Sequence, residues 1–394
     1  MSAIQPSILT WARRTAGLSI EDAALALGFT DTRGRSGVQR LEALERGEDE
    51  PARGVLLKMA KVYRRPLLVF YLAEPPKIGD RGQDFRTLPE RKRFNPELDA
   101  LVRDIKARQG LIRSMLEDDN AEPVEIVNSV TIDLPAPTLA ARMAGQLNFS
   151  LAAYRAAKSA DEAFSYLRET IEASGVFVLL LGNLGSHHTN IPLEVFRGFA
   201  LADRIAPMIV INDQDAKAAW PFTALHELAH LWLGHTGISA EDGENRIERY
   251  CNDVAGEFLL PGLDVGSLAP VQKQSVNALS DHVERLARTL HVSRSMVAYR
   301  LYRTGSIDKT TWATLSQRFR DEYLRFRQRE AAKSRNAEGG PDYYVVRRHR
   351  VGQTLLRLVR RSLDDGTISY TKAGTVLGVK PRNVEPLLSL RGTR

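Results

Sequence analysis

Residues 222–237 have the sequence "FTALHELAHLWLGHTG", and this stretch carries the clearest information about the fold. Pro221 precedes it and suits the first turn of a helix, where the missing N–H costs nothing. Apolar side chains such as Phe222, Leu225 and Leu228 cover most sides of this helix, which is typical of a buried segment. The sequence therefore predicts a helix in the core of a domain.

Two histidines and a glutamate stand in the middle of this helix. His226 and His230 are four positions apart, so their imidazoles can converge on one ion, and Glu227 follows the first of them. In H-E-x-x-H sites this glutamate accepts a proton from the metal-bound water. A chance match in a chain of this length occurs on the order of once in a hundred. The alternative is a set of internally paired core residues, but three ionisable groups in an apolar helix favour a compensating divalent cation. We predict zinc, Zn2+.

The helix expected within 243–261, "GENRIERYCNDVAGEFLLP", supplies the third ligand. A catalytic zinc usually has three protein ligands and keeps one position for water. Glu248 lies beside the apolar stripe of this helix and Asn252 follows one turn later. Glu257 lies half a revolution away from Glu248, so the two cannot face one ion. Glu248 is the expected ligand, Glu244 is the alternative, and Asn252 is a candidate to orient a ligand by hydrogen bonding.

The composition is that of a chain with several domains in a reducing compartment. The 394 residues are 43% hydrophobic and 26% charged, which suffices for two or three packed domains. The single cysteine, Cys251, excludes internal disulfides and a cysteine-rich zinc site. No apolar run approaches the roughly 20 residues of a membrane span, and the first residues lack the pattern of a signal peptide. We therefore expect a cytoplasmic protein with no membrane partner.

Residues 1–80 have the pattern of short helices joined by tight turns. The stretches "WARRTAGLSIEDAALALGF", "LEALERGEDEP" and "LLKMAKVYRRPLLVFYLAEPP" resemble the N-terminal module of the Xre-type helix-turn-helix families, and the resemblance implies DNA binding. The presumed recognition helix and its exit are acidic, with Glu42, Glu45, Glu48, Asp49 and Glu50 against Arg40 and Arg46. This charge opposes the phosphate attraction that dominates DNA affinity. DNA binding and a structural or protein-docking role both stay open.

The middle of the chain predicts an α+β domain that is mostly helical. Residues 81–137 are expected to be a helical linker with a long helix at about 96–117, and 138–308 a zinc metallopeptidase-like domain. Three runs rich in Val, Ile, Leu and Phe, "GVFVLLLGN", "VFRGFALAD" and "APMIVIND", predict the strands of a small sheet. The third run is also a candidate edge strand, on which an extended peptide could bind through backbone hydrogen bonds.

The end of the chain is basic. Residues 309–340 are expected to be a charged helical linker and 341–394 a helical C-terminal domain. The latter holds eleven Lys and Arg against four Asp and Glu, an excess equal to the net charge of +7 of the whole chain. Six arginines lie close together in its sequence: Arg347, Arg348, Arg350, Arg357, Arg360 and Arg361. This domain could bind nucleic acid without reading its sequence, or dock on an acidic surface of the same protein.

Four stretches together resemble one family of metallo-endopeptidases. They are "APMIVIND", "FTALHELAHLWLGH", "IERYCNDVAGEFLLP" and "LARTLHVSRSMVAYRL", and over about 140–305 the chain looks like the ImmA/IrrE family. The resemblance implies a zincin-like domain in which a gluzincin-like set, His226, His230 and Glu248, binds zinc. It also implies that Glu227 is the general base, that a repressor-like module is often fused to the peptidase, and that some members cleave a transcriptional repressor.

Two functions compete at this point. The favoured hypothesis is a zinc endopeptidase that hydrolyses peptide bonds of a regulatory protein such as a repressor. The alternative is a DNA-binding transcriptional regulator whose peptidase-like domain is a sensor or holds a structural metal. Glu227 favours the enzyme, because a structural site needs no base. Four side chains are candidates for the donor that stabilises the oxyanion: Tyr250, His235, His188 and Tyr299.

Overall fold

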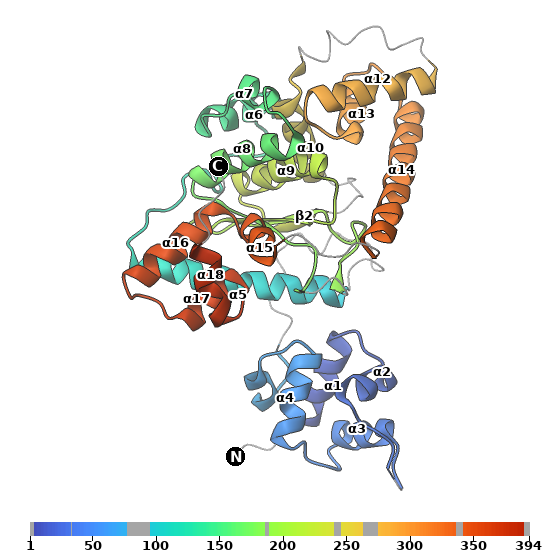
Figure 1. Cartoon of the computed structure of the whole chain (residues 1–394), viewed down its shortest axis with the longest axis vertical. Coiled ribbons are helices and arrows are strands. Elements are labelled where there is room, and N and C mark those ends of the chain that lie inside the picture. The colour runs from blue at the N-terminus through green and yellow to red at the C-terminus, as the bar shows by residue number, and fades with distance from the viewer. Residues whose placement is uncertain are drawn as a thin grey trace. The chain divides into compact units, whose positions relative to one another are not determined.

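The computed structural model forms two compact units, Met1–Asp104 and Ile105–Arg394 (Figure 1). It describes residues 4–32, 34–76, 95–185, 189–239, 246–262, 275–335 and 342–389. These residues are mostly helical with one small sheet, which agrees with the predicted α+β class. None of the helices described in these ranges has the length and apolarity needed to cross a membrane.

The first unit is a bundle of short helices around its own apolar core. Ser19 begins the second helix by accepting a hydrogen bond from the N–H of Asp22, and Gly28 ends it in a left-handed conformation. Ser36 and Gln39 form a reciprocal capping box at the next helix. The elements are α1 (Pro6–Thr15), α2 (Ile20–Leu27), α3 (Gly37–Arg46), α4 (Arg53–Val62) and the 3-10 helix η1 (Leu67–Tyr71).

Most acidic side chains on and after α3 have arginine partners within this unit. Glu45 forms an ion pair with Arg13 of α1 at 2.7 Å, and the two side chains are only 8% and 12% exposed. The further pairs are Arg46 with Glu42 and with Glu48, and Arg35 with Asp49. Glu45 thus ties α3 to α1, and α3 presents less negative charge to a partner than its sequence alone indicates.

A four-stranded sheet forms part of the second unit (Figure 1). Its strands are β1 (Phe177–Leu180), β2 (Gly198–Leu201), β3 (Met208–Ile211) and β4 (Gly237–Ser239), in the order β1-β3-β2-β4. β1 is parallel to β3, whereas β2 is antiparallel to both β3 and β4. The first three confirm the predicted strands.

The prediction that "APMIVIND" forms an edge strand is wrong. This sequence forms β3, which pairs with β1 on one side and with β2 on the other. Its four residues are all fully buried. A run of hydrophobic residues predicts a buried strand. It does not predict which strands pair with it, because those strands come from distant parts of the sequence.

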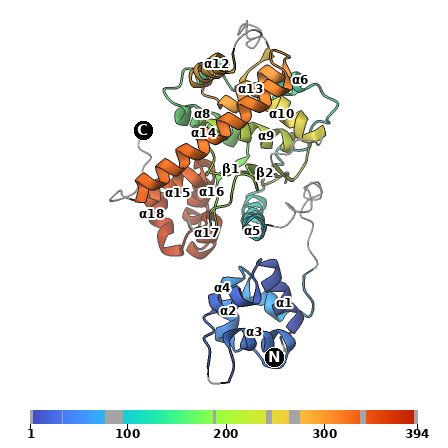
Figure 2. The same cartoon turned by 90° about the vertical axis from the view of Figure 1, so that its right-hand side faces the viewer.

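Helices pack around the sheet. α9 (Trp220–Trp232) packs on β2, β3 and α10 (Arg246–Leu259), and α10 also packs on α6 (Ala136–Gln146). The long helix α5 (Pro96–Asp118) spans the division between the two units and confirms the predicted long helix. The other helices of the second unit before its C-terminal domain are α7 (Leu151–Arg155), α8 (Ala160–Ala173), the 3-10 helix η5 (Lys217–Ala219), α12 (Val276–Thr289), α13 (Arg294–Arg303) and α14 (Lys309–Arg335). Figures 1 and 2 show α14 on the outside of this unit.

The C-terminal end of α9 is capped by a segment distant in sequence. The N–H of Asn128 donates to the carbonyl of Leu231 at 3.0 Å, and the N–H of Ser129 donates to that of Trp232 at 2.9 Å. The last carbonyls of a helix have no partner within the helix, so these bonds satisfy groups that would otherwise be buried without one. Part of the segment 81–137, expected to be a linker, therefore belongs to the core of the second unit.

Five short elements close the described chain and pack on the rest of the second unit. They are α15 (Tyr343–Val351), α16 (Gln353–Asp364), α17 (Tyr370–Leu377), the 3-10 helix η7 (Pro381–Asn383) and α18 (Val384–Ser389). α15 packs against β1, and α16 packs against α8.

A buried ion pair on α8 holds these C-terminal helices. Arg168 and Glu172 lie 3.0 Å apart, and their side chains are 8% and 3% exposed. Arg168 also donates to the carbonyl of His349, and Glu172 accepts the N–H of Thr354 at 3.1 Å. Losing one partner of a buried pair leaves an uncompensated charge and costs about 3–5 kcal/mol. The C-terminal helices are therefore an integral part of this unit.

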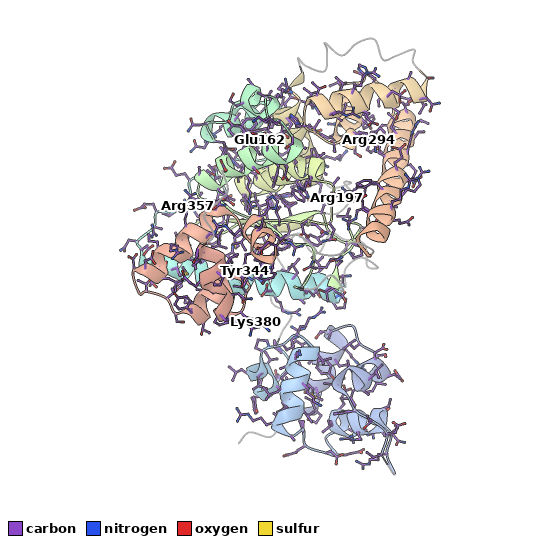
Figure 3. All side chains as sticks on the ribbon, viewed as in Figure 1. Glu162, Arg197, Arg294, Tyr344, Arg357 and Lys380 are labelled. Atoms are coloured by element: carbon purple, nitrogen blue, oxygen red, sulfur yellow. The ribbon has the colours of Figure 1, made fainter. Side chains whose placement is uncertain are left out.

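Most of the arginines in the basic C-terminal domain are engaged within the second unit. Their acceptors are Leu377 and Gly378 for Arg347, Leu387 for Arg348, Asp213 for Arg350, Glu385 for Arg360 and Asp119 for Arg361. Arg357 and Lys380 are exposed (Figure 3). Two of these contacts, to Asp213 and Asp119, join the domain to acidic groups outside it, whereas the others lie within it.

Replacing Gly352 by alanine will strongly destabilise the second unit. Gly352 has φ 90° and ψ 155°, a region essentially reserved for glycine, and a Cβ there would lie 2.2 Å from Glu172 Oε1. We expect urea denaturation to give a free energy of unfolding lower by about 3 kcal/mol or more. Gly366→Ala is the matched control, with φ 69° and nothing within 4 Å, and should cost only about 1–2 kcal/mol. Equal costs would contradict this account.

Candidate metal centre

α9 carries the ionisable residues of the motif into the core. All of its residues except Phe222 are buried, and His226, Glu227 and His230 are 4%, 0% and 1% exposed. The predicted buried helix is thereby confirmed. The two histidines lie one turn apart and project toward α10, where Glu248 stands in the first turn.

Three potential ligand atoms meet between α9 and α10. The Nε2 atoms of His226 and His230 are 3.1 Å apart. Glu248 Oε2 lies 3.2 Å from His226 Nε2, and Glu248 Oε1 lies 3.2 Å from His230 Nε2. Among the described residues, this is the one group of three or more His, Cys, Asp or Glu side chains placed to hold a metal ion.

The chemistry and spacing of these atoms fit zinc. Two imidazole nitrogens and one carboxylate oxygen are ligands that zinc accepts in catalytic sites. A tetrahedral ion with bonds of about 2.0–2.1 Å separates its ligand atoms by roughly 3.3 Å, close to the 3.1–3.2 Å found here. Three protein ligands leave one coordination position for water or substrate.

The side chains of this cluster influence one another's ionisation. Burial is the largest single influence on His226 and opposes its charge, but the hydrogen bond to Glu248 and the nearby negative charges together outweigh it, so the pKa of His226 is raised. Burial likewise opposes ionisation of Glu248, but its bonds to His226 and His230 lower the pKa of this carboxyl well below its usual value. The carboxylates therefore favour positive charge at this position.

Two further side chains act on His226. The negative charge of Glu227 raises the pKa of His226, and so does a hydrogen bond to Asn252. Asn252 thus reaches the imidazole from α10, one turn beyond Glu248. The roles of Glu227 as a base and of Asn252 as an orienting residue stay predictions.

Two candidates for the oxyanion donor, Tyr250 and Tyr299, have hydrogen-bond partners outside the cluster. Tyr250 donates its hydroxyl to the carbonyl of Leu134 at 2.7 Å, and burial raises its pKa to about 12. Tyr299 donates to Asp253 at 2.9 Å. The other residues named from sequence are His235, which is half-buried beyond α9, and Glu244 and His188, which lie outside the described residues.

Sequence analysis missed one residue beside Glu227. Gly198 begins β2 and is buried directly against the Glu227 side chain. The signal was an isolated glycine inside the strand pattern "VFRGFALAD". Such a glycine often marks a close approach to the backbone.

One segment of the chain is similar to a known family. Residues 182–302 match the Peptidase M78 family, described as the IrrE N-terminal-like domain. The match supports the ImmA/IrrE resemblance over this segment and indicates peptidase activity. It contains both histidines, Glu227, Glu248 and Asn252. No curated protein and no solved structure matches the chain.

Elemental analysis of purified protein will test the ligand set. We expect about one zinc per chain, retained in Glu227→Gln, which leaves all three ligand atoms in place. Glu248→Ala and His230→Ala each remove a ligand and should lose the ion. Asn252→Ala should weaken zinc binding by about 10–100-fold.

Glu257→Gln is the control for these variants. Glu257 lies on the same helix as Glu248 but pairs with Arg300, so this variant should keep its zinc. A folded wild-type protein that binds no zinc after incubation with the metal would refute the proposed centre.

Proposed function

We propose that the second unit is a zinc-dependent endopeptidase. The observation that carries the proposal is the triangle of His226 Nε2, His230 Nε2 and the Glu248 carboxylate, next to the buried Glu227. The Peptidase M78 match over 182–302 supports a peptidase.

The chain's own residues would divide the work of amide hydrolysis. A bound zinc ion would lower the pKa of a water to about 7 and polarise the scissile carbonyl. Glu227 would accept the proton of that water and deliver it to the leaving nitrogen. Because Glu227 is 0% exposed, its charge acts in a medium of low dielectric constant, where electrostatic effects are large. Asn252 would hold His226 in orientation.

The proposed substrate is a regulatory protein such as a transcriptional repressor. This part rests on the ImmA/IrrE resemblance and on the first unit, which we propose is a helix-turn-helix module formed by α2 and α3. Its Arg13–Glu45 pair fixes α3 against α1 and would keep the face of this module rigid. The module would recruit the substrate or the DNA to which the substrate is bound.

The alternative is a transcriptional regulator in which the metal is structural or sensory. Both hypotheses expect zinc and a folded second unit. They differ at Glu227, since only the enzyme needs a carboxylate there. The decisive comparison is therefore a variant that keeps the metal and loses the base.

We expect Glu227→Gln to keep zinc and to lower peptide hydrolysis by about 10²–10⁴-fold. The amide has nearly the shape of the carboxylate but cannot accept the proton. Mass spectrometry of protein N-termini in cells that express each form will identify new termini that depend on Glu227. The cleaved protein, once purified, then gives the rate with zinc-loaded enzyme.

Glu257→Gln serves as the control and should produce the same new termini as the wild type. New termini that appear equally with Glu227→Gln would refute a role for this carboxylate. Zinc-loaded wild type that yields none, but regulates transcription, would favour the alternative.

A further inference from the structure

We infer that Gly198 of β2 is a positioning residue for Glu227: the strand has no side chain there, and the Glu227 carboxylate occupies the space this leaves. The inference rests on the proposed function, in which Glu227 is the base. It adds a residue of the sheet to a centre otherwise made by α9 and α10.

The strand above Glu227 has little freedom to move. Gly198 pairs with Ile211 of β3 on one side and with Ser239 of β4 on the other. β2 is therefore held by backbone ladders along both edges, and α9 packs against it. Any added volume at position 198 must be absorbed by α9.

A methyl group at position 198 would overlap with two side chains of α9. Its Cβ would lie 2.7 Å from Thr223 Cγ2, 2.8 Å from Glu227 Oε1 and 3.1 Å from Glu227 Cγ. Ordinary contacts between such atoms are about 3.5–4.0 Å. Glycine leaves a slot that fits the glutamate side chain.

Glu227 is the side chain that would give way. Thr223 is β-branched, so its χ1 is stiff, and its hydroxyl donates to the carbonyl of Ala219 at 3.3 Å. Glu227 has three side-chain torsions, and its Oε1 atom is at the far end. A Cβ at position 198 would therefore shift the carboxylate while His226 and His230 keep their places.

Such a shift would separate metal binding from catalysis. A displacement of about 1 Å of a reacting group can cost on the order of 10² in rate. The three atoms nearest to a Cβ at position 198 belong to Thr223 and Glu227, not to the candidate metal ligands. Glycine inside a strand weakens the strand. The close contact with Glu227 gives a physical reason for a glycine at position 198.

A double-mutant cycle tests the slot without any substrate. Gly198→Ala is combined with Glu227→Gln, which keeps the side-chain volume, and with Glu227→Ala, which empties the slot. All proteins carry Thr223→Ser, which removes Cγ2 but keeps the hydroxyl. Thermal unfolding of the zinc-loaded proteins should show that Gly198→Ala lowers Tm by roughly 3–10 °C in the Gln background. In the Ala background the shift should be less than half as large.

Gly145→Ala on α6 is the matched control, because nothing lies within 4 Å of a Cβ there. Its small effect on Tm should be the same in both backgrounds. If the shift caused by Gly198→Ala is also the same in both, Glu227 does not fill the slot and the inference is wrong.

A kinetic test distinguishes positioning from packing. With the substrate protein identified through its new N-termini, Gly198→Ala should lower kcat on the order of 10² while zinc content and KM stay close to the wild type. In the Glu227→Asp background, whose carboxylate is withdrawn from the slot, the same change should alter kcat less than about threefold. An unchanged kcat in Gly198→Ala would overturn the positioning role. A wild-type protein without hydrolysis would instead overturn the proposed function, and the unfolding cycle would still decide whether Glu227 fills the slot.

Discussion

The second unit depends on compensating the charges that α9 carries into the core. His226, Glu227 and His230 are at most 4% exposed, and an isolated buried charge costs several kcal/mol. Glu248 provides the first compensation by contacting both imidazoles from α10. Two carboxylates, Glu227 and Glu248, then stand near two imidazoles. Imidazoles that bind a metal are neutral, so a divalent cation would balance both carboxylates. The packing of α10 on α9 therefore also assembles the three candidate metal ligands.

α9 is held near both ends by segments outside 182–302. The carbonyls at its C-terminal end accept N–H groups from residues 128–130. In the loop before it, the carbonyl of Gln214 accepts the hydroxyl of Tyr323 on α14 at 2.7 Å, and Asp213 pairs with an arginine of α15. Catalytic geometry tolerates errors of only about 0.5 Å. The family match therefore covers the candidate ligands but not all the contacts that hold α9.

Contacts set by local sequence patterns could be predicted from the sequence, whereas contacts that depend on the tertiary arrangement could not. His226 and His230 were predictable because helical periodicity alone brings them together, and Glu248 because one apolar stripe sets the orientation of its helix. The pairing of β3 with two strands and the contact between Gly198 and Glu227 were not predictable, because both depend on which strands and helices meet in the fold. The sequence offered only an isolated glycine in a strand, without indicating what would approach it.

The basic C-terminal domain shows that composition alone does not say which charges can reach a partner. Its excess of seven positive charges is a property of composition, but association with nucleic acid depends on cations that can reach phosphates. Arg347 is buried and directed at carbonyl oxygens, whereas Arg350 and Arg361 face carboxylates of the same unit. Arg357 and Lys380 are exposed, and each phosphate contact adds about 0.9 to the salt dependence of binding to duplex DNA. The formal excess therefore overstates the charge available to a partner, because Arg347, Arg348 and Arg360 bind groups within the C-terminal domain. Arg350 and Arg361 join this domain to Asp213 and Asp119.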